Sequence, residues 1–487
     1  MKEIALIALP LIFAAAAFAW PDERSRPRLL PIVGTLHAVL AFWLLIDPPA
    51  LAAHAWFGFD PLARAVLPMV SLLFLVCSMY GVTYLQIRAE RKNRIFVTAL
   101  LVMLGLLSLA LQAQNLGVLW VAAEATTLVT VPLLHFNGTG RAFEASWKYL
   151  LVGGTGIALS LLGSFCLGYA SLMGGGDGDL TFSSLNALFI QMTPVKAVLA
   201  HPWLVTAWVL LIAGYGTKMG LAPMHTWKPD AYGEAPGIVG ALLAGGTTTM
   251  AFVAILRVKQ VVDAAGGGAM TERTLLAFGL FSMFAAALFL LGTPDYKRML
   301  AYSSVEHMGI LTVGAALGGA GLWAALFHVW TNALTKGSMF LSAGNIRRAA
   351  GAQTEDKVSG MAWRTPGSAR LFIVGLFAVT ACPPFGVFFS ELQILLAAFK
   401  TGNVLAATVF LGCLLFAFFG MTRLVFAIVD GRPRAAARKT HERFPELPGI
   451  IVPPLLFLAL SLWLGLATPP LLHHVWVAAA KILSPTP

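Results

Sequence analysis

Residues 210–227 read LLIAGYGTKMGLAPMHTW, and this stretch decides how the whole chain is interpreted. It begins as an apolar run of the kind that crosses a bilayer, but three glycines and Pro223 interrupt it around a single charge, Lys218. Glycine and proline weaken helical hydrogen bonding, so the stretch predicts a membrane helix that is broken beside a buried lysine. A broken helix exposes backbone dipoles to a cavity and lets water enter. The alternative is a lysine that extends to the membrane surface.

The composition agrees with a chain that lies in lipid. Of its 487 residues, 58% are hydrophobic and only 11% are charged, whereas soluble domains carry about 25% charged residues. A chain of this length and composition cannot cover a water-facing surface, so a bilayer is the expected solvent.

Fourteen segments are apolar and long enough to span a bilayer, which predicts an all-α polytopic membrane protein. The N-terminal run resembles a signal peptide, but in a chain that stays apolar to its end we expect it to remain as the first helix. Residues 470–484 form either a fifteenth short helix or an interfacial one. The predicted segments are 3–20, 29–48, 65–87, 95–113, 115–136, 149–172, 200–222, 237–256, 274–292, 299–318, 321–345, 371–399, 403–428 and 449–468.

Lysine and arginine are distributed unevenly between alternate loops. If the loop after the first segment is called inside, the inside loops carry 22 of the 33 basic residues, outside positions carry 8, and 3 lie within segments. The positive-inside rule then places both termini outside, which is the periplasm for a bacterial inner-membrane protein. The same bias explains the net charge of +11 without nucleic acid as a partner.

A second interrupted segment, residues 380–395 (TACPPFGVFFSELQIL), places Glu391 just after a Pro-Pro-Phe-Gly break. The two broken segments are the seventh and the twelfth, so they are five helices apart. An odd separation predicts two inverted five-helix repeats, with the ion site at the broken helices. The predicted parts are an N-terminal three-helix region (1–90), a first repeat (91–262), a second repeat (263–430) and a C-terminal helix region (431–487).

Ionisable residues inside the predicted helices are functional candidates, because a charge in mid-bilayer costs at least about 2.5–3.5 kcal/mol. Glu124 lies in the middle of NLGVLWVAAEATTLVTVPLL and predicts a proton-carrying or charge-pairing carboxylate. A hydrogen bond between helices is the alternative for Glu124, and a helix cap or an interfacial carboxylate is the alternative for Glu391.

A polar stripe runs along the eleventh segment, where His328, Asn332 and Lys336 recur every four residues on one helix face. We expect this face to be lined by water. Glu306 and His307 form a similar polar break in the tenth segment, either as accessory groups or as interhelical hydrogen-bonding partners.

Metal and redox centres find no support in the sequence. The four cysteines lie far apart in apolar runs and form no CxxC pair, at positions Cys77, Cys166, Cys382 and Cys413. His328 has no second ligand at metal-binding spacing. We therefore expect no metal and no cofactor in this chain.

Four motifs, taken together, resemble the antiporter-like membrane subunits of complex I, Mrp antiporters and membrane-bound hydrogenases. The combination of SSVEHMG with TNALTK is most similar to the F component of hydrogenase-4 and formate hydrogenlyase-type complexes. The motifs are KMGLAPMHTWKPDAYGEAP (218–236), AYSSVEHMGI (301–310), HVWTNALTKGSMFLSAGNI (328–346) and PPFGVFFSELQIL (383–395).

This resemblance implies fourteen helices with inverted five-helix repeats. It also implies proton-transfer roles: Glu124 matches a fifth-helix glutamate, and Lys218 matches the seventh-helix lysine that pairs with it. His328 and Lys336 match the polar eleventh helix, and Glu391 matches the ionisable residue of the twelfth.

The eighth helix departs from the family pattern. Many members carry a lysine or histidine there, whereas GGTTTMAFVAILR offers only hydroxyls, among them Thr249. Lys228 and Tyr232 stand where leucine and histidine are frequent. His225 and Asp230, from the same motif, complete the accessory candidates.

Three functions remain open from the sequence. The first is a proton-translocating subunit of a redox-driven complex, whose electron transfer takes place in a peripheral arm and whose partners are other membrane subunits. The second is a subunit of an Mrp-type cation/proton antiporter, with sodium as an alternative to the proton. The third is a non-conducting membrane scaffold. Whether the chain belongs to an enzyme depends on its partners.

Overall fold

The computed structural model describes residues 2–51, 55–430 and 443–483, and in these ranges the chain is helical, with three isolated β-bridges and no longer strand. The predicted all-α class is confirmed. In chain order the elements are α1 (Lys2–Ala19), η1 (Arg26–Arg28), α2 (Leu29–Ile46), α3 (Pro61–Ile87), α4 (Arg94–Gln112), α5 (Leu116–Leu134), η2 (His135–Asn137), α6 (Gly140–Met173), α7 (Phe182–Ile190), α8 (Pro194–Met219), α9 (Trp227–Glu234), α10 (Gly237–Leu242), η3 (Leu243–Thr247), α11 (Thr248–Ala264), α12 (Gly268–Gly292), α13 (Tyr296–Leu317), α14 (Gly319–Ala350), α15 (Met361–Arg364), α16 (Pro366–Val379), α17 (Gly386–Lys400), α18 (Val404–Val429), α19 (Pro448–Leu466) and α20 (Pro470–Leu483).

The predicted spanning segments are found at nearly the predicted positions. Eleven helices of the described residues are long and apolar enough to cross a membrane. The remaining three segments are α13, α14 and the broken pair α16–α17, which are more polar or interrupted. α6 begins earlier than predicted because the Thr139 side chain caps it by accepting from Ala142 N. α20 is a separate helix and, at about 21 Å, is too short to span.

Both predicted helix breaks are present. α8 ends at Met219 because Gly220 adopts a left-handed conformation, with φ 80°, that a helix cannot continue. The chain then turns through Pro223 and resumes as the short helix α9. In the twelfth segment α16 stops at Val379, and α17 starts at Gly386 after the two prolines.

The two repeats correspond element by element. The first consists of α4, α5, α6, α8–α9 and α10–α11, and the second, in the same order, of α12, α13, α14, α16–α17 and α18. The third helix of each repeat is unusually long, with 34 residues in α6 and 32 in α14. The residue boundaries of the four-part division remain a prediction.

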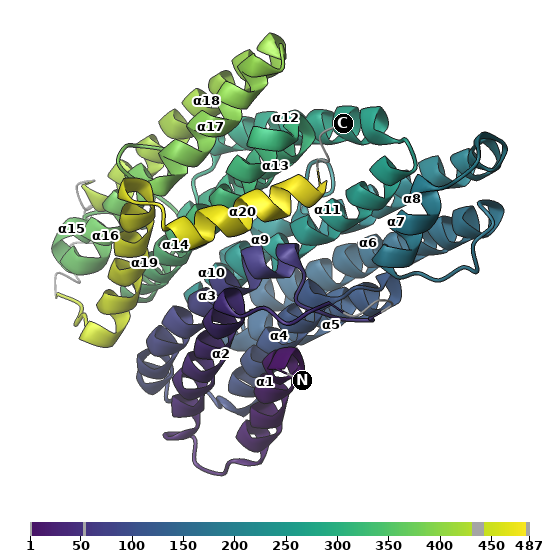
Figure 1. Cartoon of the computed structure of the whole chain (residues 1–487). Coiled ribbons are helices and arrows are strands. Elements are labelled where there is room, and N and C mark those ends of the chain that lie inside the picture. Colours follow the sequence, from purple (N-terminus) through teal and green to yellow (C-terminus); the bar gives the residue numbers. More distant parts are fainter. Residues whose placement is uncertain (1, 52–54, 431–442, 484–487) are drawn as a thin grey trace.

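The eighth segment lies at the centre of the bundle. All residues of its most apolar stretch, within α10, η3 and α11, are buried, whereas only 22% of the residues in the most apolar stretch of α1 are buried. The π-helical turn η3 brings glycine backbone against α14, since a Cβ on Gly245 would lie 3.0 Å from Ala333 Cβ. Figure 1 shows the N-terminal helices and α16–α19 on different sides of the bundle, with α20 lying across it against α3, α11 and α14.

Loops that are distant in sequence contact one another, as an alternation of loops between two faces requires. On the inside face Asn137 and Arg347 both donate to the Glu234 carbonyl. On the outside face Phe57 forms a β-bridge with Ala113. Arg432, Arg434, Arg438 and Lys439, counted in the last inside loop, lie outside the described residues.

Three of the basic residues assigned to inside loops, Arg26, Lys228 and Lys297, are buried instead, which corrects that assignment. Lys228 is 0% exposed and Lys297 is 1% exposed. Lys297 Nζ donates to the carbonyls of Gly233 and Ala235, because α13 begins directly beneath the end of α9. The short helix α7 was also not predicted, since its nine residues are too few to show as a span.

Candidate functional site

Lys218 lies in the last turn of α8, immediately before the break, and is buried with 1% of its surface exposed. Its Nζ donates to Thr127 Oγ1 at 2.6 Å and to Tyr149 Oη at 3.3 Å. These partners come from α5 and α6, so three helices hold one ammonium group.

Glu124 lies one turn before Thr127 on α5 and is only half-buried. It interacts electrostatically with Lys218, but the two groups form no direct ion pair, and Thr127 is the hydrogen-bond partner of the lysine. Glu124 Oε2 is buried without a hydrogen-bond partner among the described residues. The pairing of Glu124 with Lys218 is therefore indirect in this conformation.

Small residues on α6 make room for this cluster. A Cβ on Gly153 would lie 3.1 Å from Thr127 Cγ2, and one on Gly154 would lie 3.7 Å from Glu124 Oε1. The GGTG run at 153–156 therefore serves close helix packing around the charged groups, as in many membrane helices.

Lys336 is a buried lysine of the second repeat, but it lies on α14, which corresponds to α6, whereas the broken segment that corresponds to α8–α9 carries Glu391. Lys336 is fully buried, and its Nζ donates to Ser303 Oγ of α13 at 2.5 Å. Two buried carboxylates, Glu306 on α13 and Glu391 on α17, act on its charge. Glu306 is on the second helix of its repeat, as Glu124 is in the first, so the residue predicted as accessory belongs to the central cluster.

The two histidines of the polar stripes meet, although they are 21 residues apart. His307 Nδ1 lies 2.9 Å from His328 Nε2, and His328 Nδ1 lies 2.8 Å from Ser390 Oγ. Ser390 donates its own proton to Val387 O, so neutral His328 must donate from Nδ1 and accept from His307 at Nε2. His307 Nδ1 is also 3.9 Å from Glu391 Oε1. The result is an oriented hydrogen-bonded chain from His307 through His328 to Ser390, with the Glu391 carboxylate beside it but outside hydrogen-bond distance.

Asn332 and Glu391 carry buried polar atoms that have no protein partner among the described residues. These are both amide atoms of Asn332 and both carboxyl oxygens of Glu391. Buried polar groups of this kind are binding places for ordered water. This agrees with the predicted water-lined face of the eleventh segment.

His307, His328 and Glu391 also offer three possible metal ligands whose atoms all lie within 4.8 Å of one another. Reasoning from local spacing missed this set, because its members come from three helices. The Lys336 charge acts on both imidazoles, which opposes a divalent cation. The expectation of a metal-free chain remains a prediction.

Thr249 is buried in α11, directly after the π-helical turn, and its hydroxyl has no hydrogen-bond partner in the described part of the chain. The hydroxyl of Thr248, by contrast, donates to Ala244 O at 2.8 Å. The hydroxyl of Thr249 is therefore available to water at the centre of the bundle.

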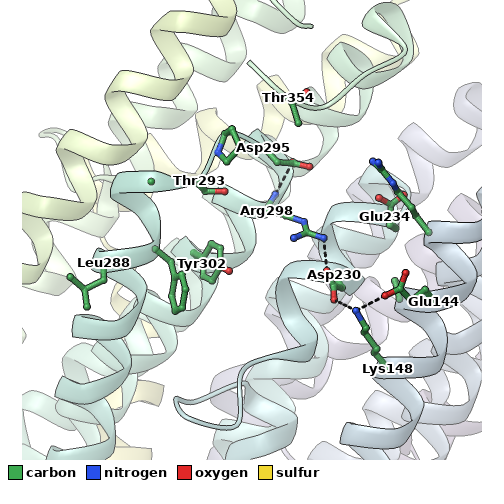
Figure 2. A pocket seen from close by; sticks show the side chains of 15 residues that line it. Glu144, Lys148, Asp230, Glu234, Leu288, Thr293, Asp295, Arg298, Tyr302 and Thr354 are labelled. Carbon is green, nitrogen blue, oxygen red and sulfur yellow. Dashed lines mark hydrogen bonds and ion pairs between the residues drawn. The ribbon is translucent and has the colours of Figure 1, made fainter. Parts of the chain in front are cut away.

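Asp230 lies at the inside face, where it anchors ion pairs in the wall of a cavity of ≈ 660 Å³. Its carboxylate pairs with Lys148 at 3.0 Å and with Arg298 at 2.5 Å, and Figure 2 shows it between these two cations. Burial raises the pKa of Asp295, in the same wall, above its ordinary value, although hydrogen bonds from backbone N–H groups lower it in part. The wall of this cavity therefore combines the carboxylates of Asp230 and Asp295 with the cations Lys148 and Arg298.

His225 lies in the turn between α8 and α9, nearly buried at 7% exposure. Its ring packs 6.5 Å from that of Tyr302, which lines the cavity. The charge of Lys228 also acts on the His225 imidazole. His225 therefore stands between the inside cavity and the interior, whereas Asp230 stays at the cavity wall.

Sequence reasoning missed Lys228 as a site residue because a basic residue between two spanning segments is normally a loop residue. The signal was its surroundings, since the loop PMHTWKPDAYGEAP contains three aromatic rings and three prolines. A loop of that kind is expected to pack rather than to be solvated.

Two broken helices in a many-helix bundle, each with buried charges beside the break, define the class of antiporter-like membrane subunits. A model of the family described as "NADH:quinone oxidoreductase/Mrp antiporter, TM" matches residues 113–417. The chain belongs to this family. The matched region contains every one of the ten predicted site residues.

Similar proteins agree with this assignment. The chain is 32% identical over 441 residues to the hydrogenase-4 component F homolog of Methylacidiphilum infernorum, covering 86% of this chain and 90% of that protein. It is 30% identical to NADH-quinone oxidoreductase subunit N of Desulforudis audaxviator, covering 82% and 80%. A solved chain of the membrane-bound sulfane sulfur reductase, an archaeal respiratory membrane complex, has the same fold with a TM-score of 0.86 at 23% identity, over 99% of this chain and 97% of that one.

These findings confirm the resemblance and the fold class stated from the sequence. The chain is a multi-pass, antiporter-like membrane subunit of the kind found in complex I, hydrogenase and Mrp-type assemblies. Other membrane subunits are therefore its expected neighbours.

Proposed function

We propose that this chain translocates protons as a membrane subunit of a redox-driven complex of the hydrogenase-4 or complex I type. The observation that carries the proposal is the cluster of buried ionisable groups around Lys336, which joins Glu306, His307, His328 and Glu391. Groups of this type within a bilayer are costly and are kept where charge must move.

The proton path has two halves. In the first, a change in the partner subunits alters the electrostatic coupling of Glu124 to Lys218, and Lys218 then releases its proton toward the second repeat. In the second, Lys336 passes a proton through His328 and His307 to Glu391. Water at the unpaired polar atoms of Asn332 and Glu391 connects these groups, because proton transfer needs hydrogen-bond reach at every step.

The driving force must come from outside this chain. Moving one charge against the membrane potential costs about 2.3 kcal/mol per 100 mV. The described residues contain no pair of neighbouring cysteines, and we propose that the chain holds no redox cofactor. Electron transfer then belongs to a peripheral redox arm that is coupled through the other membrane subunits.

We place the chain in the inner membrane of a bacterium with both termini in the periplasm. The support is the excess of basic residues on the inside loops together with the common face that those loops share. Proteolysis or thiol labelling of each terminus in sealed vesicles tests this orientation.

The test is proton uptake by proteoliposomes that contain the full-length chain, driven by a potassium diffusion potential. We expect flux in the wild type and a loss of at least about tenfold in Lys218→Met and in Glu391→Gln. Glu355→Gln, which removes an ion pair with Arg423 at the inside end of α18, is the matched control and should conduct normally.

The outcomes separate the three functions that the sequence left open. Wild-type flux without sodium supports proton translocation. Flux that requires sodium supports the Mrp-type antiporter, which the family description also names. Equal and negligible flux in the wild type and Glu391→Gln would show a scaffold and refute the proposal.

A further inference from the structure

Lys228 is a buried lysine that the proton path described above does not use. It lies on α9, in the break of the seventh segment, and none of its surface is exposed. Its single hydrogen bond within the described residues is from Nζ to Ser304 Oγ at 3.3 Å, and no carboxylate pairs with it there. The ring of Tyr232 lies 5.8 Å from the same nitrogen.

The backbone of the break holds this side chain in place. A Cβ on Gly220 would lie 2.3 Å from Lys228 Cε and 2.8 Å from its Nζ. Only a glycine fits here, both for the left-handed backbone and for the lysine stem that lies against it. Lys228 is therefore held against the residue that directly follows the helix carrying Lys218.

On the other side, Lys228 adjoins the cluster of the second repeat through two consecutive serines of α13. Lys228 donates to Ser304, and Lys336 donates to its neighbour Ser303. The two ammonium charges act on one another. One turn of α13 thus receives a lysine from each repeat.

Toward the first repeat, the rings of Trp227 and Tyr149 connect Lys228 to the surroundings of Lys218. Trp227, next to Lys228, packs 5.0 Å from Tyr149, whose hydroxyl accepts from Lys218. The ring of Trp227 also packs 5.9 Å from that of Tyr232. Lys228 is thus linked to the surroundings of Lys218 through Trp227 and Tyr149, and to those of Lys336 through Ser304 and Ser303.

The three lysines, Lys218, Lys228 and Lys336, are matched in number by three buried or half-buried glutamates. Glu124 acts on Lys218, while Glu306 and Glu391 act on Lys336. Of these lysines, Lys228 alone has no carboxylate of its own among the described residues, so its charged form lacks the compensation that a buried ammonium needs. A lysine in this setting is suited to hold a proton briefly and to pass it on.

We propose that Lys228 is the proton-transfer group that joins the two repeats, in the role that the hydroxyls of the eighth helix leave open. The Lys218 ammonium gives a proton to the neutral Lys228 amine, and Lys228 then gives one to the neutral Lys336 amine. Each transfer breaks one N–H bond and forms another, and no electron moves. This inference rests on the proposed function.

The test compares replacements of Lys228 in the proteoliposome assay. Lys228→Met keeps the length of the side chain but cannot bind a proton, and Lys228→Arg keeps the charge but does not release it. Lys228→His keeps a group that titrates near neutrality. We expect a loss of roughly a hundredfold in the first two variants and partial retention of flux in the third.

Lys259→Met is the matched control, because Lys259 is also buried, at 4% exposure, but pairs with Asp263 on its own helix. It should conduct like the wild type. Thermal stability and yield are measured for each variant, so that a folding defect is recognised. If Lys228→Met does not fold, the comparison of Lys228→Arg with Lys228→His decides the question.

Wild-type rates in Lys228→Met or Lys228→Arg would overturn the inference, as would equal losses in folded Arg and His variants. A lysine that only fills space or supplies a fixed charge gives these results. If the wild type itself carries no protons, the proposed function fails first, and that outcome is distinct from a conducting Lys228→Met.

Discussion

Gly220→Ala tests whether the position of Lys228 matters, without changing any titratable group. Alanine in the left-handed conformation of Gly220 costs about 1–2 kcal/mol. Its Cβ would also lie 2.3 Å from Lys228 Cε, whereas carbon atoms at optimal contact are about 3.5 Å apart. The lysine stem must therefore move by about 1.2 Å or more.

That movement breaks the hydrogen bond from Lys228 to Ser304, which at 3.3 Å is already long. We expect proton flux to fall by roughly tenfold or more, since proton transfer depends on hydrogen-bond reach. The assay is the same proteoliposome uptake, with the stability of the purified chain followed by thermal unfolding in detergent.

Gly351→Ala is the matched control. Gly351 ends α14 in the same left-handed conformation, with φ 71°, and its Cβ would meet nothing within 4 Å. The backbone cost of the two substitutions should therefore be similar, and only Gly220→Ala should lose flux. Equal flux in the two variants, with equal losses of stability, would refute the reasoning.

Three further predictions concern the groups around this path. Thr127→Val removes the 2.6 Å acceptor of Lys218, so flux should fall severalfold and Thr127→Ser should restore it; normal flux in the valine variant would contradict the role of Thr127. Dialysis against a metal chelator should leave flux unchanged, because the charge of Lys336 opposes a cation at the His–His–Glu set; a loss that zinc reverses would reveal a resident metal. Asp230→Asn should lower the free energy of unfolding by no more than about 1 kcal/mol, since its ion pairs lie at the cavity wall, and a change above about 3 kcal/mol in denaturation would show a structural role.

The spanning helices and both helix breaks could be predicted from the sequence. Hydropathy over about 20 residues and the positions of glycine and proline are local properties, and they locate α8 and α17 without knowledge of the neighbours. The candidates Lys218, Lys336 and Glu391 followed from the same local rule, because each is a charge within an apolar run.

Partners between helices could not be predicted. The contact of His307 with His328 and the hydrogen bond from Lys336 to Ser303 join residues 21 and 33 positions apart. Their approach depends on how the helices pack, and no local pattern specifies it.

Lys228 shows most clearly which features follow from the sequence alone and which only from the tertiary structure. Its charge, and its place between two spanning segments, are local features, and they predict a solvated loop residue. Only the tertiary structure decides that α9 turns back into the bundle, because the left-handed Gly220 reverses the chain and α13 packs beneath it. The sequence by itself therefore determined which segments cross the membrane and which charges they carry, whereas packing decided that the lysines of the two repeats meet at neighbouring serines.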